Sequence, residues 1–260
     1  MNEFRFKRFT VRNELSPMKV GTDGVLLGAA VGIEESDRRI LDIGTGTGVI
    51  AMMLAQRYAD TAGLNASVTA ATDTAKGRSE ADGPGRIRIT GIDIDAPATQ
   101  EAAANFGTCP WAANLEAINT SLADFRTEES FDLIVSNPPY FDNSLKNPSE
   151  RVSEARHCIS LSYREIIRFA KDRLTADGRL AFILPADERL RVERELRSFS
   201  LFPFKVTGIR TTTRKKPSRI IVESSRTRAE SVQEKDLSIM ENGDFTAEYR
   251  KLTEDFYLYP

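Results

Sequence analysis

The chain has 260 residues, of which 40% are hydrophobic and 28% are charged, and its formal net charge at neutral pH is −2. This composition is typical of a globular protein, and the length suits one α/β domain rather than two large ones. The cysteines Cys109 and Cys158 lie far apart and His157 is the only histidine, which argues against a disulfide framework and against a metal site. The N-terminus has no apolar signal region, and no apolar run reaches the roughly 20 residues of a membrane span, so a cytoplasmic protein is expected.

The predicted elements alternate between strands and helices. We expect strands at 38–44, 86–93, 116–122, 131–136, 179–184, 204–210 and 219–224, and helices at 49–58, 96–106, 162–174 and 187–199. Such alternation predicts a parallel sheet with helices on both faces, while the last two strands, with no helix between them, predict an antiparallel hairpin. The expected fold class is α/β, a Rossmann-like, doubly wound, mostly parallel seven-stranded sheet with an antiparallel C-terminal hairpin.

We expect a single domain over residues 1–260 with three additions to the sheet. Residues 1–37 form a basic N-terminal segment. Residues 60–85 are rich in small and polar residues where a short link is usual, which predicts a disordered surface insertion, with an extra hairpin as the alternative. Residues 227–260 form a C-terminal extension that starts with a polar linker at 227–234.

A glycine-rich loop, DIGTGTG, follows the first strand and opens a helix. The glycines Gly44, Gly46 and Gly48 let the backbone approach a ligand closely, and Thr45 lies between them. Their spacing differs from the G-x-G-x-x-G of dinucleotide sites. Asp42 would repel a pyrophosphate but can accept a hydrogen bond from the amino group of a methionine moiety. The loop therefore favours S-adenosylmethionine over NAD, with a ligand-free strand–helix turn as the alternative.

Acidic residues also follow the next two strands. Asp93 ends the second strand, where a carboxylate can accept both ribose hydroxyls of an adenosine, and Ile94 belongs to the same expected site. Asp95 is the second choice for that role. After the third strand, Asp124 can accept from the adenine amino group while Phe125 packs nearby. Taken singly, each carboxylate could instead be a solvated loop residue.

The tetrapeptide Asn137-Pro138-Pro139-Tyr140 follows the fourth strand and is the most specific motif in the chain. Two prolines fix a stiff loop at the carboxyl end of the sheet, where open α/β folds bind ligands. The side-chain carbonyl of Asn137 and the main-chain carbonyl of Pro138 can both accept from one NH2 group, which points the nitrogen lone pair at a methyl sulfonium. Tyr140 offers a face for stacking a base or an amide.

The pairing of DIGTGTG with NPPY resembles the methyltransferases that modify adenine N6, guanine N2 or glutamine N5. A narrower match, MKVGTDGVLLG at 18–28, resembles the opening signature of the bacterial tRNA1(Val) adenine-37 N6-methyltransferase family, and further matches are SNPPYF at 136–141, ARH at 155–157, KPSRIIVE at 216–223 and LTEDFYL at 252–258. The resemblance breaks only at 60–85. It implies that Gly21, Thr22 and Asp23 close over S-adenosylmethionine; a helix start capped by Thr22 or Asp23 is compatible with that role.

The basic residues are concentrated in two segments. Residues 205–228 hold eight basic residues and one acidic residue, a local net charge of +7, and residues 1–20 hold five basic and two acidic residues, or +3. Such asymmetry suits a polyanion. We expect RNA contacts from Lys19, Arg214, Lys215, Lys216 and Arg219, with a solvated basic loop as the alternative.

Together these features predict methyl transfer from S-adenosylmethionine to N6 of adenine 37 in the anticodon loop of a tRNA, by a monomer without a metal. His157, beside Arg156, either orders the loop after NPPY, contacts RNA or is structural. Three alternatives remain. A glutamine N5-methyltransferase of release factors usually carries an N-terminal helical domain, and a guanine N2-methyltransferase of ribosomal RNA usually has another aromatic residue after the prolines. A non-catalytic RNA-binding module is the third.

Overall fold

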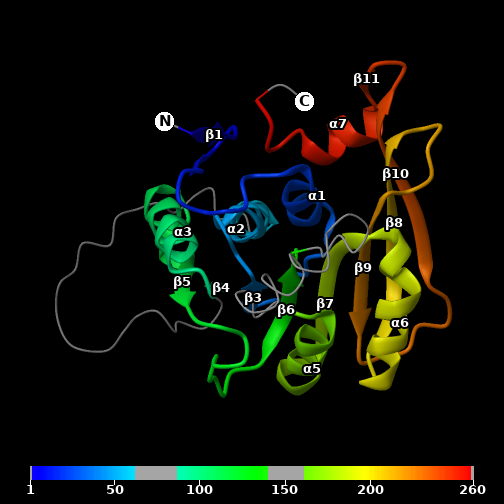
Figure 1. The fold of residues 1–260 in the computed structure, drawn as a ribbon, viewed down its shortest axis with the longest axis horizontal. Coiled ribbons are helices and arrows are strands. Elements are labelled where there is room, and N and C mark those ends of the chain that lie inside the picture. The colour runs from blue at the N-terminus through cyan, green and yellow to red at the C-terminus, as the bar shows by residue number, and fades with distance from the viewer. Residues whose placement is uncertain (1, 62–86, 140–160, 259–260) are drawn as a thin grey trace, which may run out of the picture.

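The computed structural model describes residues 2–61, 87–139 and 161–258, and they form one twisted sheet with helices on both faces (Figure 1). Its nine strands lie in the order β11-β10-β8-β9-β7-β6-β3-β4-β5. They are β3 (Arg39–Ile43), β4 (Arg88–Asp93), β5 (Leu115–Asn119), β6 (Phe131–Ser136), β7 (Leu174–Pro185), β8 (Phe202–Thr212), β9 (Arg219–Ser225), β10 (Gln233–Glu241) and β11 (Asp244–Phe245). A separate hairpin joins β1 (Glu3–Arg5) to β2 (Thr10–Arg12).

The predicted fold class is confirmed, but the number of strands differs from the prediction. All seven predicted strands are present, and β8 and β9 pair antiparallel as the predicted hairpin. The sheet has nine strands because β10 adds parallel to β8 and β11 pairs antiparallel with β10. Most residues of β10 are exposed and Leu237 is its one buried residue, so the ladder with β8 rather than an apolar pattern defines this strand.

Alternation of side chains along the central strands builds two hydrophobic cores. In β7, Ala181 and Ile183 face one core while Leu180, Phe182 and Leu184 face the other. The first core lies under the helices α1 (Thr22–Ala30), α2 (Val49–Thr61), α3 (Ala96–Thr108) and α7 (Ala247–Thr253), and the second under α5 (Tyr163–Arg173) and α6 (Arg189–Ser198). Short 3-10 turns lie at Ala112–Asn114 and Ala186–Glu188.

The start of α5 follows a signal that is visible in the sequence. The hydroxyl of Ser162 accepts from the backbone N–H of Glu165, and the carboxylate of Glu165 accepts from the backbone N–H of Ser162. This reciprocal capping satisfies two donors at the helix start. It explains why the helix begins where it was predicted.

The start of β7 was predicted less well. A turn was expected at Asp177 and Gly178, yet the strand already begins at Leu174. Its pairing with β6 shifts between Phe131, opposite Leu174, and Leu133, opposite Arg179, so the intervening residues bulge out of the ladder. The sequence signal for a turn therefore marks a bulge inside a longer strand.

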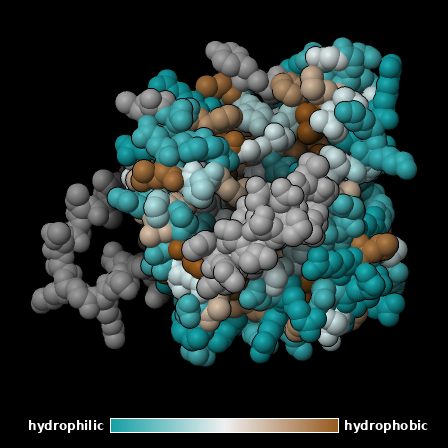
Figure 2. All heavy atoms as spheres, in the orientation of Figure 1, coloured by the Kyte–Doolittle hydropathy of each residue, from teal (hydrophilic) through white to brown (hydrophobic). Residues whose placement is uncertain are grey.

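Part of the predicted insertion at 60–85 lies outside the described residues, which resume at residue 87 after a gap from 62 to 86. Asp60 belongs to α2. The coloured residues on the face shown in Figure 2 are mostly hydrophilic, and the hydrophobic ones form small separate patches. Within the described ranges, no helix is both long enough and apolar enough to span a membrane.

Candidate functional site

The predicted cofactor and catalytic residues lie along one edge of the sheet. Strands β4, β3, β6 and β7 are parallel neighbours, so their carboxyl ends meet at this edge. Asp93 ends β4, the glycine loop follows β3, and Asn137 follows β6. In open α/β folds this edge is where ligands bind, so the topology brings the predicted groups together.

The glycines of the loop are required by its backbone. Gly44, Gly46 and Gly48 have φ angles of +73°, +56° and +82°, a region that residues with a side chain rarely adopt. A Cβ atom at Gly48 would lie 2.4 Å from Cε1 of Phe106 on α3. The N–H groups of Gly44 and Thr45 both donate to the carbonyl of Ile92 and tie the loop to β4. Because a ligand-free turn would need these glycines too, they do not identify a ligand by themselves.

Asp42 indicates the kind of ligand more specifically than the glycines do. Its side chain is fully buried, and Oδ2 accepts from the hydroxyl of Thr45 at 2.8 Å. Oδ1 has no hydrogen-bond partner among the residues that the structure describes. Burial raises the pKa of Asp42 to about 7; the hydroxyl of Thr45 and the backbone of Ala51 oppose this rise, and the nearby Asp93 adds to it. A buried carboxylate with an unused oxygen suits a cationic ligand group such as an ammonium.

Asp93 links the loop to the end of β4. Its Oδ2 accepts from the N–H of Gly46 at 2.8 Å, and its Oδ1 accepts from the N–H of Asp95 at 2.9 Å. Burial raises the pKa of this carboxyl as well. Ile94 is 54% exposed, which leaves an apolar side chain at the edge of the sheet next to the carboxylate. Asp95, the second choice for ribose binding, caps α3 through a bond from the N–H of Ala98.

The third acidic position is more exposed. Asp124 lies in a turn after β5, where its Oδ2 accepts from the hydroxyl of Ser121 at 2.6 Å. Phe125 packs against Phe169 of α5, with ring centroids 6.0 Å apart. The structure thus gives Phe125 a packing contact in the core under α5 and leaves the Asp124 carboxylate at the surface.

The NPPY motif starts next to the glycine loop. The hydroxyl of Ser136 donates to the carbonyl of Ile43 at 2.7 Å, which fastens the end of β6 to the end of β3. Asn137 is half-buried, Pro138 is buried and Pro139 is exposed. Tyr140, together with Arg156, His157 and Cys158, lies outside the described residues.

Two residues of α3 hold the N-terminal segment beside the glycine loop. Neither residue was singled out in the sequence analysis. The carboxylate of Glu101 accepts from the N–H groups of Leu15 and Ser16 at 2.9 and 2.8 Å, and also from that of Glu14. Burial raises the pKa of Glu101, but these donors outweigh it, so the net shift is downward. Asn105, one turn further on, donates to the carbonyls of Arg12 and Thr47. In the sequence, this anchoring could have been suspected only from a Glu and an Asn that lie four residues apart on an alanine-rich helix.

The signature MKVGTDG leads from this segment into α1. Gly21 precedes α1 in an extended conformation and makes no side-chain cap, and Thr22 is exposed. A Cβ atom at Gly24 would lie 3.3 Å from Cγ1 of Val49, so the start of α1 packs against the start of α2. Asp23 forms an ion pair with Arg219 of β9, with 3.0 Å between Oδ2 and Nε.

The predicted RNA-binding residues fall into two groups. Arg214, Lys215 and Lys216 are exposed in the turn between β8 and β9, and none of the three forms an ion pair with another described residue. Because β8 runs parallel to β7, this turn lies at the same edge of the sheet as Asn137. Lys19 bonds to the main-chain carbonyls of Asn13 and Glu14 within its own segment.

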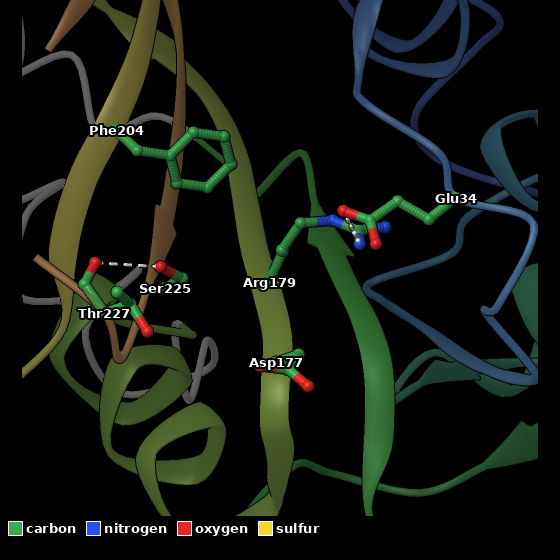
Figure 3. Close-up of a pocket in the computed structure, with 6 residues that line it drawn as sticks. All are labelled: Glu34, Asp177, Arg179, Phe204, Ser225 and Thr227. Carbon is green, nitrogen blue, oxygen red and sulfur yellow. Dashed lines mark hydrogen bonds and ion pairs between the residues drawn. The ribbon is translucent and has the colours of Figure 1, made fainter. Parts of the chain in front are cut away.

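The opposite edge of the sheet holds a cavity of about 230 Å³ (Figure 3). It is lined by Glu34, Asp177, Arg179, Phe204, Ser225 and Thr227. Arg179 pairs with Glu34 and with Asp37, each at 2.6 Å. Its charge is thus neutralised within the fold, so we place the candidate site at the edge with the glycine loop.

The fold defines this chain as a class I methyltransferase domain. Residues 33–215 match the model of an RMKL-like methyltransferase domain. Two solved structures share the fold at 16% sequence identity. A predicted O-methyltransferase from Agrobacterium tumefaciens has a TM-score of 0.58 and covers 90% of this chain and 96% of its own. A 16S rRNA N2 methyltransferase from T. thermophilus, in complex with AdoMet and guanosine, has a TM-score of 0.55 and covers 87% of this chain and 50% of its own.

Relatives of similar length show to which family this chain belongs. The tRNA1(Val) (adenine(37)-N6)-methyltransferase of Bacteroides thetaiotaomicron is 32% identical over 98% of this chain and 97% of its own length. The enzyme of that name from Parabacteroides distasonis is 36% identical, again over 98% and 97%. The enzyme of that name from Flavobacterium johnsoniae is 33% identical over 98% of this chain and 99% of its own length. The chain therefore belongs to the tRNA1(Val) (adenine(37)-N6)-methyltransferase family, as the sequence motifs indicated.

Proposed function

We propose that this protein transfers a methyl group from S-adenosylmethionine to N6 of adenine 37 in the anticodon loop of a tRNA1(Val)-type tRNA, acting as a monomer in the cytoplasm. The observation that carries the proposal is the close placement of three features at one sheet edge. These are the buried Asp42, with an unused oxygen, the glycine loop and the NPP segment fastened to it through Ser136. The family membership supports the choice of adenine over glutamine or guanine.

The cofactor supplies an electrophilic methyl group on a positively charged sulfur, and the loop is suited to hold the rest of that molecule. Asp42 would accept from the ammonium of the methionine part through its unused oxygen. Asp93 would accept from the ribose hydroxyls, with the exposed Ile94 beside it, and Asp124 would accept from the adenine amino group with Phe125 nearby. Gly21, Thr22 and Asp23 border the site at the start of α1.

At the other side of the loop, Asn137 and Pro138 act on the acceptor base. Their two carbonyl oxygens accept from one NH2 group, which orients its lone pair and stabilises the positive charge that develops on nitrogen. No strong base is needed, because the methylated nitrogen is acidic and loses its proton readily. Pro139 stiffens the segment, and Tyr140 stacks on the base.

The anticodon loop suits this chemistry because its bases are already unpaired, so that moving one into the site costs less than in a duplex. Arg214, Lys215 and Lys216 bind phosphates at the same edge, with Lys19 as a further basic residue near the site. The turn is two to three strand spacings from the end of β6, roughly 10–15 Å, which is a fitting distance for phosphates that flank the target base.

The test is methylation of an unmodified tRNA1(Val) transcript with isotopically labelled S-adenosylmethionine, followed by mass spectrometry of the nucleosides. We expect N6-methyladenosine as the product, and no product from a transcript with guanine in place of adenine 37. A release factor and 16S rRNA serve as competing substrates. Label in a glutamine of the release factor, or in a guanine of the rRNA, would replace the proposal by the corresponding alternative.

A further inference from the structure

Arg219 and Asp23 are far apart in the sequence and belong to two regions with different expected tasks. Asp23 lies in the first turn of α1, beside the cofactor loop, and Arg219 is the first residue of β9, directly after the basic turn. The structure joins them by an ion pair of 3.0 Å between Nε and Oδ2. Asp23 is thus already engaged by a cation of the protein itself.

The position of Arg219 is fixed by the sheet. It pairs with Pro185 at the end of β7 and with Ile209 of β8. The carbonyl of Ser218, just before it, accepts from the N–H of Ala186 at 3.1 Å. The backbone from which the guanidinium extends is therefore held on both sides.

From Asp23 the contacts continue to the glycine loop. Gly24 packs against Val49 and Ile50, the first two residues of α2, and these follow Gly48 directly. The side chains of Asp23 and Arg219 are only 26% and 34% exposed, so solvent screens this pair less than a fully exposed one. The ion pair thus joins β9 to the start of α1, and the start of α1 in turn packs against the helix that the glycine loop opens.

We propose that Arg219 is a positioning residue for cofactor binding: through Asp23 it keeps the start of α1 seated on the glycine loop, and it is not itself a phosphate ligand of the RNA. The proposal rests on the proposed function for the location of the cofactor. It assigns to Arg219 a role different from that of Arg214, Lys215 and Lys216, although all four belong to one basic stretch. Asp23 then acts on the cofactor through the fold rather than by direct contact.

The experiment measures S-adenosylmethionine affinity by calorimetry and tRNA affinity by filter binding at several salt concentrations. The variants are Asp23→Asn, Arg219→Gln, their combination, Arg219→Lys, and the exchange Asp23→Arg with Arg219→Asp. Arg88→Gln is the matched control, because Arg88 pairs with Glu129 at the same 3.0 Å but begins β4, at the opposite edge of the sheet.

We expect each single variant to weaken cofactor binding by about two- to five-fold, the size that a partly exposed ion pair supports. The double variant should be no weaker than the poorer single one, since both remove the same interaction. Arg219→Lys and the exchanged pair should recover part of the loss. The KM for S-adenosylmethionine should rise while kcat at saturation stays unchanged. Neither the tRNA affinity of Asp23→Asn nor any property of Arg88→Gln should change.

A direct phosphate contact by Arg219 predicts the opposite pattern. Arg219→Gln would then weaken tRNA binding and flatten its salt dependence, and Asp23→Asn would strengthen tRNA binding by releasing the arginine. Unchanged cofactor affinity in both single variants would also overturn the proposal. If the unaltered protein failed to bind S-adenosylmethionine at all, the proposed function would fail instead, so the two failures are distinguishable.

Discussion

At the scale of single residues, Asp42 is a carboxylate whose protonation should be linked to ligand binding. Burial raises its pKa to about 7, so the free protein holds a proton there below neutral pH. A cationic ammonium next to the carboxylate favours the ionised form and lowers this pKa in the complex. Binding must then release a proton, and the affinity must increase as the pH rises towards 7.

This linkage predicts weaker binding of S-adenosylmethionine at acidic pH. Between pH 5.5 and 7, where an α-amino group stays protonated, the affinity should rise by up to about tenfold per pH unit. Calorimetry in buffers of different ionisation enthalpy measures the released proton directly. Asp42→Asn should bind more weakly and lose the pH dependence. An unchanged dependence in that variant would assign the titration to another group, with Asp93 the first to examine.

Asn137 yields a prediction about chemistry rather than binding. Asn137→Ala should reduce the rate of methyl transfer on the order of 100-fold or more, because one of the two acceptors for the target NH2 group is lost. Its cofactor affinity should stay close to that of the unaltered protein. Single-turnover rates with saturating tRNA, together with calorimetry, separate these effects. A variant that keeps a rate within a few-fold of the original would show that Asn137 does not orient the target nitrogen.

At the scale of structural elements, the glycine loop combines a local and a long-range requirement. Gly48 has a φ angle of +82°, and a methyl group on it would meet the ring of Phe106. Gly48→Ala should therefore lower the free energy of unfolding by about 2–4 kcal/mol, from backbone strain and overpacking together. Gly107 is the control, because it lies in α3 with open space around its Cα.

The comparison of the two alanine variants by urea unfolding tests this account of the loop. Gly107→Ala should leave the stability unchanged or raise it by up to about 1 kcal/mol, since alanine is the better helix former. If Gly48→Ala proved as stable as the original protein, the loop conformation described here would be wrong. Cofactor binding by Gly48→Ala should be weaker as well, because the substitution would displace the backbone of the glycine loop.

Elements with a strong local signal could be predicted from the sequence, and those defined by tertiary contacts could not. Strands β3 and β6 are near-continuous apolar runs, and α5 begins with a capping box, so each was located correctly. Strand β10 reads QEKDLSIME, without an apolar repeat, and forms because β8 offers it a ladder. The β1–β2 hairpin is too short for a periodic signal; an aromatic cluster that includes Phe6 and Tyr257 holds it instead.

The same distinction holds for the site. The glycines and Asp42 could be found because their spacing reflects a local turn. Asp95 caps a helix and Phe125 packs in a core, and these contacts depend on where α3 and α5 begin and on what they pack against. The anchoring by Glu101 and the ion pair of Arg219 each join residues more than 80 positions apart, so no local pattern could reveal them.

At the scale of the whole molecule, charge is distributed unevenly although the net charge is only −2. The basic turn of β8 and β9 lies at the edge of the sheet that holds the candidate site. The basic N-terminal segment is less available, since Arg8 pairs with Asp60 at 2.6 Å and lies over the ring of Trp111. The exposed turn is therefore the more favourable surface for phosphates, and the N-terminal segment is largely occupied with internal contacts.

The last prediction tests this surface. Replacing Arg214, Lys215 and Lys216 together by Ala should weaken tRNA binding and flatten its salt dependence, because each lost phosphate contact removes roughly one unit or somewhat less from the slope of log affinity against log salt. Titrations of an unmodified tRNA at several salt concentrations measure both quantities. S-adenosylmethionine binding should not change, since the turn is separated from the glycine loop by the ends of β6 and β7.

Arg164→Ala is a suitable control for the triple variant, because it removes a cation of α5 that already pairs with Glu195. If the triple variant kept the original slope, the RNA would have to bind elsewhere, and Lys19 would be the next residue to replace.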